Sequence, residues 1–121
     1  MIFIIDSDEV MAECIKKACL ECGEETRIFE NAIDAMAMID VRLPKMIILD
    51  VMLIGPDGFS FLNELISYTD TAKIPVVIVS DLDFEKIDLR VYGVVEILNK
   101  DFLRPEQIKK CINKYIKNHE E

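Results

Sequence analysis

Short apolar runs along this chain alternate with longer segments in which apolar residues recur at helical spacing. The runs are rich in aliphatic and β-branched residues, which is typical of strands buried on both faces. They are Ile2–Ile5, Met46–Leu49 and Val76–Val79. We also expect strands at Thr26–Phe29 and Val94–Leu98, each of which contains one charged residue. Because strand and helix alternate five times, we predict right-handed crossovers and a parallel sheet with helices on both faces. The predicted fold class is therefore a three-layer α/β domain.

The segments between the runs carry apolar stripes and helix end signals. The stripes are Val10, Met11, Cys14, Ile15, Ala18 and Cys19; Ala32, Ile33, Met36, Ala37 and Ile39; Phe59, Leu62, Leu65 and Ile66; Phe84, Ile87 and Val91; and Ile108, Cys111, Ile112, Tyr115 and Ile116. We expect Ser7 or Asp8 to cap the first helix and Gly23 to end it. Asn31 is the expected cap of the second helix, and Pro105 suits the first turn of the last.

Length and charge narrow the class of protein. With 121 residues we expect one domain spanning 1–121. No apolar run could span a bilayer and no secretory signal is visible, so we expect a cytoplasmic protein without a membrane contact. The net charge of −9 argues against nucleic acid as a partner and favours basic or cation-bearing partners.

Four cysteines could be ligands, a disulfide or core residues. Cys19 and Cys22 have the spacing of half a zinc or redox site, but they fall at the end of a helical pattern rather than after a strand. Cysteine is also a small hydrophobe that commonly fills cores. We therefore favour the core interpretation for all four, including Cys14 and Cys111.

Four polar residues each stand at the end of a different predicted strand. Asp6 follows the first strand, Asp50 the third, Ser80 the fourth and Lys100 the fifth. In a parallel sheet these ends share one edge, so residues far apart in sequence are expected to converge there. Taken singly, each could be a cap, a turn residue or a solvated charge; their convergence favours a functional site.

The four groups have a common chemical logic. Two carboxylates with loop carbonyls form a hard oxygen site suited to Mg²⁺. One carboxylate can act as a nucleophile and form an acyl phosphate. A hydroxyl and an ammonium can hold the oxygens of the transferred phosphoryl group, and so supply the charge stabilisation that phosphoryl transfer needs.

On these residues the chain resembles a response-regulator receiver domain of two-component signalling over essentially its whole length. Asp6 and Ser7 match the acidic pair after the first strand, and Asp50 matches the phosphoacceptor. Asp57-Gly58, Ser80 and Lys100 match the family's later motif positions. The resemblance implies a flavodoxin-like (βα)5 fold with strand order 2-1-3-4-5. It also implies transfer of a phosphoryl group to Asp50 from a histidine kinase or phosphotransferase, with Mg²⁺.

The resemblance further implies roles for individual residues. Asp50, Lys100 and Ser80 would carry the transfer, while Asp6, Asp50 and the backbone carbonyl of Met52 would hold the metal, with Ser7 or Asp8 contributing through water. The protein would then be no enzyme beyond its own phosphorylation and dephosphorylation. Since the chain stops at Glu121 without an effector domain, we expect output through contact with a downstream protein, at the face of helix four, strand five and helix five.

Several positions depart from the family pattern. Ser7 replaces the second acid, which should weaken Mg²⁺ binding because ligand charge sets much of a hard cation's affinity. Asp101 replaces the proline after Lys100, and a cis bond before Asp would be costly, so we expect a rebuilt or trans loop. Ile54 replaces a loop proline, and Ile97 stands where the family's switch aromatic would be. With a stretch 80–93 that is about two residues short, these changes suggest a weaker conformational switch.

Three alternatives remain open from the sequence. Asp6-Ser7-Asp8 after a strand is similar to the nucleophile motif of haloacid dehalogenase-type phosphatases, although this would leave Asp50 unexplained. Ser7 and Asp101 would also fit a degenerate receiver that acts as a docking module without phosphorylation. A flavin-binding domain is disfavoured, because no hydroxyl- or glycine-rich phosphate loop follows the first strand.

Overall fold

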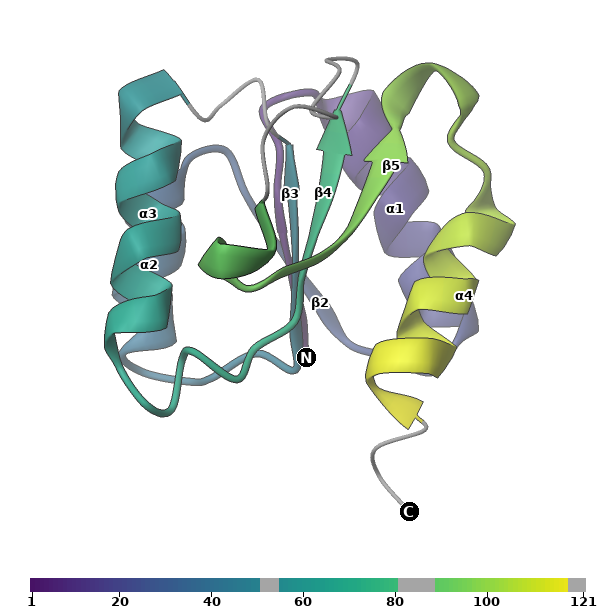
Figure 1. Cartoon of the computed structure of the whole chain (residues 1–121). Helices are drawn as coiled ribbons and strands as arrows, with labels where there is room; N and C mark the ends of the chain where they lie inside the picture. Colours follow the sequence, from purple (N-terminus) through teal and green to yellow (C-terminus); the bar gives the residue numbers. More distant parts are fainter. Residues whose placement is uncertain (51–54, 81–88, 118–121) are drawn as a thin grey trace.

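Within the described residues of the computed structural model, five strands and four α-helices alternate along the chain (Figure 1). The structure describes residues 1–50, 55–80 and 89–117, apart from the side chains of residues 55–58 and 80. The elements are β1 Ile2–Ile5, α1 Glu9–Glu21, β2 Thr26–Phe29, α2 Ala32–Ile39, β3 Met46–Asp50, α3 Gly55–Ser67, β4 Val76–Ser80, the 3-10 turn η2 Leu89–Tyr92, β5 Val94–Asn99, the 3-10 turn η3 Lys100–Phe102 and α4 Pro105–Tyr115.

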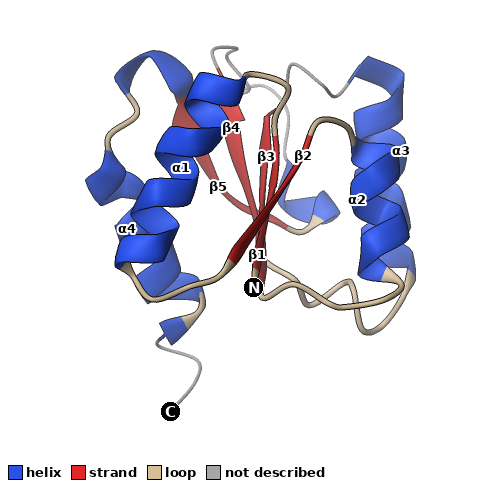
Figure 2. Ribbon diagram, turned by 180° about the vertical axis from the view of Figure 1, so that it is seen from behind, coloured by secondary structure: helices blue, strands red, loops and turns tan. Residues whose placement is uncertain are grey.

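The strands form one parallel sheet in the order β2-β1-β3-β4-β5, as expected for a flavodoxin-like fold. Helices α2 and α3 lie on one face of the sheet, while α1 and α4 lie on the other (Figures 1 and 2). The predicted three-layer α/β class and strand order are therefore confirmed. The strand ends moved by only one residue, since β3, β4 and β5 each extend one position beyond the predicted run.

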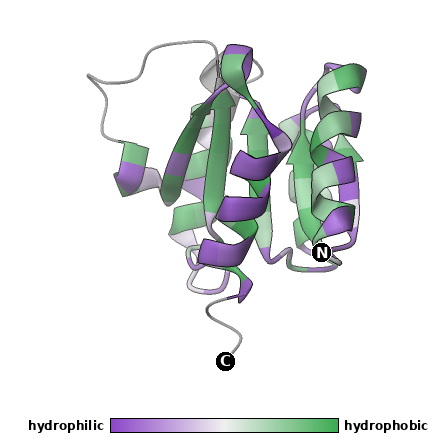
Figure 3. Ribbon diagram, turned by 90° about the vertical axis from the view of Figure 1, so that its right-hand side faces the viewer, coloured by the Kyte–Doolittle hydropathy of each residue, from purple (hydrophilic) through white to green (hydrophobic). Residues whose placement is uncertain are grey.

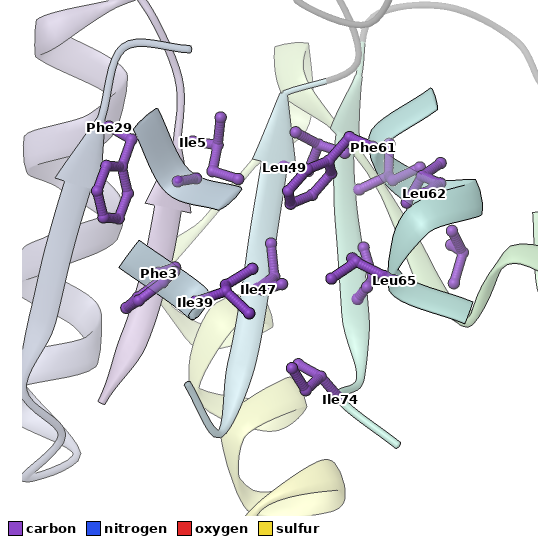
Figure 4. Close-up of a cluster of buried hydrophobic side chains, with 14 of the residues drawn as sticks. Phe3, Ile5, Phe29, Ile39, Ile47, Leu49, Phe61, Leu62, Leu65 and Ile74 are labelled. Atoms are coloured by element: carbon purple, nitrogen blue, oxygen red, sulfur yellow. The ribbon is translucent and has the colours of Figure 1, made fainter. Parts of the chain in front are cut away.

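Alternation along the strands builds two cores. Phe3 and Ile5 of β1 belong to the cluster on the α2 and α3 side, together with Ile47 and Leu49 of β3 (Figure 4). Their neighbours, such as Ile4, point to the cluster shared with α1 and α4. Because both faces are covered, every residue of β1 is fully buried, which explains its unbroken apolar run.

The stripe predicted for α1 was wrong in part. Ala12, Ile15, Ala18 and Cys19 are buried, but Val10 is 75% exposed and Cys14 is also exposed. The buried set recurs at spacings of three and four residues, and Val10 and Cys14 fall outside that face. The phase of the stripe was misread because apolar residues occupy both sides of this helix.

The cysteine prediction holds for only two of the four residues. Cys19 and Cys111 are buried in the cluster between the sheet, α1 and α4, whereas Cys22 is half-buried and Cys14 exposed. All four are free thiols. Burial raises the pKa of Cys19 to about 12 and that of Cys111 to about 11, so these two thiols stay protonated and behave as core groups.

The predicted residues cap the N-terminal ends of the first two helices, and a glycine follows the first. Asp8, rather than Ser7, caps α1 by accepting hydrogen bonds from the backbone of Val10 and Met11. Gly23 follows the helix with a φ of 80°, a left-handed conformation that favours glycine. Asn31 caps α2 by accepting a hydrogen bond from the backbone N–H of Asp34.

The third helix, α3, starts at Gly55, so Asp57 and Gly58 lie in its first turn. Phe61 is buried, and Phe59, which belongs to the predicted stripe, packs against the same cluster. Ile66 was predicted to be buried but is 38% exposed, since it lies at the margin of the buried face.

The pairing of β4 with β5 is irregular near the start of both strands. The predicted fourth helix, over residues 84–91, falls largely outside the described residues; its end forms η2. Gly93 then turns the chain with a φ of 82°. The register shifts between Val76 and Val77, so Val95 is an extra residue on β5, a β-bulge. Beyond it, α4 presents mainly hydrophilic residues outward (Figure 3).

Candidate functional site

The sheet topology brings the predicted site residues to one edge. Asp6 directly follows β1, while Asp50 is the last residue of β3, and β1 and β3 are neighbours with Ile5 opposite Leu49. Lys100 directly follows β5. All these strands are parallel, so their carboxyl ends meet above the same end of the sheet. Residues separated by more than forty positions thus become neighbours because of strand order.

An ion pair joins two of these residues. The Nζ of Lys100 donates a hydrogen bond to Oδ2 of Asp50 over 3.1 Å. The Asp50 side chain is only 3% exposed and that of Lys100 18%. A buried carboxylate is costly without a cationic partner, and a charge-assisted hydrogen bond meets that need. The predicted meeting of Asp50 and Lys100 is therefore observed.

Asp6 is buried beside this pair, and only one of its two carboxylate oxygens accepts a hydrogen bond. Its Oδ1 accepts a 2.8 Å hydrogen bond from the backbone N–H of Asp8. Its Oδ2 is buried and has no hydrogen-bond partner within the described part of the chain. A buried carboxylate oxygen of this kind is unusual and calls for a counter-charge or a proton.

The electrostatics of the two acids are linked. Burial raises the pKa of Asp6 to about 6, and the neighbouring carboxylate of Asp50 adds to the increase, while the hydrogen bond from Asp8 opposes it. Burial lowers the pKa of Lys100, but the hydrogen bond to Asp50 and the charges of Asp6, Asp50 and Asp8 outweigh this and leave it raised. Lys100 is therefore a permanent cation at this edge, facing a concentration of negative charge.

The two residues that follow Asp6 are both exposed, and one of them caps a helix. Ser7 is exposed and neutral. Asp8 is exposed, and its Oδ1 accepts hydrogen bonds from Val10 over 3.0 Å and from Met11 over 3.2 Å at the start of α1. Its carboxylate therefore has a structural task as the helix cap.

The donor set fits Mg²⁺ with few protein ligands. Asp6 and Asp50 present two carboxylates, the ligands that this hard cation prefers, and the unpaired oxygen of Asp6 lies where a cation would compensate it. Over the described ranges, no group of three or more His, Cys, Asp or Glu side chains could hold a metal ion. A cation here would accordingly keep several of its waters, as Mg²⁺ commonly does.

Two predicted contributors lie beyond what the structure describes. The backbone of Ser80 ends β4 and pairs with Asn99, which places it at the same edge, but its hydroxyl is outside the described atoms. The carbonyl of Met52 also lies outside the described residues, as does Ile54. The meeting of Ser80 and Met52 with Asp50 remains a prediction.

The sequence interpretation missed the role of Asn99. Its side-chain oxygen accepts a 2.8 Å hydrogen bond from the backbone N–H of Asp101 and caps η3, the turn that carries Lys100. No described peptide bond is cis, so the Lys100–Asp101 bond is trans, as expected for a bond before Asp. An Asn directly before a short turn is a recognisable capping signal that could have been used.

Two solved structures illustrate the similarity in fold. The receiver domain of NtrX from Brucella abortus aligns with a TM-score of 0.83 at 21% identity, covering 97% of this chain and 98% of that one. A putative response regulator from Chloroflexus aurantiacus aligns with a TM-score of 0.78 at 24% identity, covering 94% of both chains. At these identities the likeness establishes the fold.

The chain is also similar in sequence to several known proteins. The chain is 25% identical over 117 residues to a probable transcriptional regulator, ycf29, of Porphyra purpurea, covering 95% of this chain and 56% of that protein. It is 28% identical over 93 residues to PilH of Pseudomonas aeruginosa, covering 75% and 76%. The response regulator MprA of a Mycobacterium strain is 25% identical over 105 residues, covering 87% and 46%.

The chain thus spans about half the length of ycf29 and of MprA. A family model for the response regulator receiver domain matches residues 2–113, which include Asp6, Asp50 and Lys100. Because that match covers nearly the whole chain, the protein belongs to the response regulator receiver domain family.

Proposed function

We propose that residues 1–121 form one receiver domain that accepts a phosphoryl group on Asp50, in the cytoplasm, from a histidine kinase or a phosphotransferase. The observation that carries this proposal is the buried ion pair between Asp50 and Lys100, with the unpaired oxygen of Asp6 beside it. Receiver domains as a family interact with such phosphodonor proteins and generally bind Mg²⁺. The four free thiols agree with a reducing compartment.

The transfer follows from the chemistry of the edge. A carboxylate oxygen of Asp50 attacks the phosphorus of a phosphohistidine, the P–N bond breaks, and its electron pair stays on the imidazole nitrogen of the donor. The product is an acyl phosphate on Asp50. The ammonium of Lys100, held at 3.1 Å from Asp50, stabilises the charge on the phosphoryl oxygens. The Ser80 hydroxyl would hold another of these oxygens.

Mg²⁺, held by Asp6 and Asp50 with the Met52 carbonyl and through waters near Ser7 or Asp8, would supply further neutralisation of phosphoryl charge. Asp6 contributes by holding its negative charge at a fixed place next to the acceptor. Because Ser7 offers no charge and the Oδ1 of Asp8 caps α1, affinity for the cation should be lower than for a site with three carboxylates.

We further propose output through a downstream protein at the face of η2, β5 and α4. Here η2 is the end of the predicted fourth helix, and α4 is the predicted fifth. Val91 of η2 is 64% exposed and Ile97 of β5 is 41% exposed, which gives this face an apolar component. The hydroxyl of Tyr115 on α4 donates to the Val95 carbonyl over 3.1 Å and also contacts the carboxylate of Glu96, tying β5 to α4. With Ile97 in place of an aromatic side chain and β5 braced in this way, phosphorylation should remodel the face only weakly.

Labelling with a small phosphodonor tests the acceptor. With acetyl phosphate and Mg²⁺, we expect intact-mass spectrometry to show the gain of one phosphoryl group, and Asp50→Asn to abolish it because the amide is not a nucleophile. The matched control Asp40→Asn changes an exposed carboxylate and should label normally. Labelling of Asp50→Asn at Asp6 would indicate the phosphatase-like alternative, and no labelling of the natural chain would leave a docking module.

Restoring the missing acid tests the metal site. We expect Ser7→Asp to tighten Mg²⁺ binding by about tenfold or more, because an added carboxylate raises the negative charge facing the cation. Ser7→Ala should leave the affinity within about twofold, since the hydroxyl is exposed. Calorimetry or NMR titration measures both, as the chain has no tryptophan. Equal affinities for all three proteins would contradict the assignment.

The unpaired carboxylate of Asp6 should limit stability without a cation. Its folded-state pKa of about 6 lies above the unfolded value of 3.8, so its ionisation destabilises the fold fully above pH 6 and not below about pH 4. We therefore expect Asp6→Asn to stabilise the cation-free protein by about 1–2 kcal/mol at pH 7.5, less than the full value of the pKa change because the amide needs partners. The gain should vanish as pH falls from 6 to 4.

Urea unfolding across this pH range measures the effect, with Asp40→Asn as an exposed control that should change little. Saturating Mg²⁺ should narrow the difference, because it binds and stabilises only the natural carboxylate form. A loss of stability for Asp6→Asn at pH 7.5 without Mg²⁺ would refute the interpretation.

NMR with beryllofluoride, a phosphoryl mimic, tests the weak switch. We expect small shifts for η2, β5 and α4 and larger ones near Asp50. Ile97→Tyr should enlarge the shifts on β5, because an aromatic ring couples the edge to the face. Asp50→Asn serves as the control that should not respond. Large shifts from Phe84 to Tyr115 in the natural chain would overturn the idea.

A further inference from the structure

Helix α2 is apolar on nearly all sides although it lies at the surface. Asp34 is the sole polar residue in its eight positions. Ala35 and Ile39 are buried against the sheet, but Ile33 is 76% exposed and Ala37 is exposed as well. A helix that is hydrophobic all round is normally buried on all sides. The outer side of α2 therefore lacks the cover that its composition calls for.

The apolar surface continues beyond the helix into a groove. Two cavities of about 350 and 320 Å³ lie between α2 and α3 and share Met36, Asp40 and Glu64, so they form one continuous depression, here called the α2–α3 groove. Exposed apolar side chains flank or line it. They are Ile33, Val41 at 78%, Leu43 at 46% and Tyr68 at 59% exposure. Such a concentration of exposed apolar surface is a mark of an interaction site.

The groove is also acidic. Asp40, Glu64 and Asp70 line it, and no lysine or arginine does so among its described lining residues. The adjacent Arg42 makes an ion pair with Glu25 on another segment, with 3.5 Å between the charged groups. By contrast, the cavity on the outer side of α1 mixes acidic residues with Lys16 and Lys17. The α2–α3 groove thus combines exposed apolar side chains with carboxylates, and its charged residues are all negative.

Its position separates it from the ion pair of Asp50 and Lys100 and from α4, although η2 lies against α3. Helices α2 and α3 stand side by side on one face of the sheet, whereas α1 and α4 cover the opposite face (Figures 1 and 2). Asp40 and Asp70, which line the groove, follow the C-terminal ends of α2 and α3, while Asp50 is at the carboxyl end of β3. Occupation of the groove therefore need not compete with a phosphodonor.

We propose that the α2–α3 groove docks a basic amphipathic helix of a partner protein. Apolar residues of such a helix would enter between α2 and α3, where the flexible thioether of Met36 adapts to their shape. Its lysines or arginines would meet Asp40, Glu64 and Asp70. A second copy of this chain is disfavoured as occupant, because an isologous contact would bring the same carboxylates face to face.

The test uses a synthetic probe of defined chemistry. A helical peptide of about 18 residues, roughly five turns, carries leucines on one face and lysines on the other. We expect it to shift backbone NMR signals of residues 33–43 and 60–71, with affinity that weakens as salt is raised. Matched peptides with glutamine or glutamate in place of lysine should bind at least about tenfold more weakly.

Variants of the protein locate the contact. Asp40→Lys combined with Glu64→Lys should weaken binding of the lysine peptide by about tenfold or more, whereas Glu9→Lys with Glu13→Lys on α1 makes the same change in net charge and should weaken it less than about threefold. Ile33→Ser, at an exposed position that should not affect folding, should also weaken it. Asp50→Asn should bind normally, which separates this proposal from the phosphorylation proposal.

Several outcomes would overturn the assignment. Equal weakening by the α1 variant would show attraction to net charge alone. Equal affinity for the glutamine peptide would show that the carboxylates of the groove do not contribute to binding. NMR shifts centred on other residues would show that the peptide binds elsewhere. If sedimentation showed a dimer, and Ile33→Ser made it monomeric, the groove would be assigned to contact with a second copy of the chain instead.

Discussion

The burial of negative charge at the carboxyl edge of the sheet is the constraint on which this structure depends. Asp6 and Asp50 are both nearly inaccessible, and two carboxylates cannot share such a place without compensation. Lys100 compensates one of them directly, and a proton or a cation is required by the other. The three strands that carry these residues are held in register by a core on each face. The fold thereby keeps a reactive, incompletely neutralised cluster in place.

Much of this arrangement could be predicted from the sequence because it follows from topology. Once β1, β3 and β5 are recognised as parallel strands, Asp6, Asp50 and Lys100 must lie at one edge, whatever their side-chain contacts. The same argument cannot tell which carboxylate oxygen is paired. That Lys100 pairs with Asp50 while Oδ2 of Asp6 has no hydrogen-bond partner depends on the positions of the side chains, which strand order does not set.

Other features escaped prediction for identifiable reasons. The phase of the α1 stripe was ambiguous because Val10 and Cys14 extend the apolar pattern around the helix, and only packing against α4 and the sheet selects a face. The extra residue at Val95 leaves no mark in the sequence, because valine is equally common in regular strands. The exposed residues of α2 are apolar, so the sequence predicts that they are buried. Composition cannot show that one side of a helix is left uncovered.

The bulge at Val95 affects how readily the protein can aggregate through the edge of its sheet. β5 is the last strand of the sheet, and an open strand is a template on which other molecules can grow fibrils. Here the extra residue breaks the spacing of the ladder, and the phenol of Tyr115 already occupies the Val95 carbonyl. An incoming strand would find the pattern of acceptors interrupted, so this margin of the sheet resists amyloid-like stacking while its side chains stay accessible.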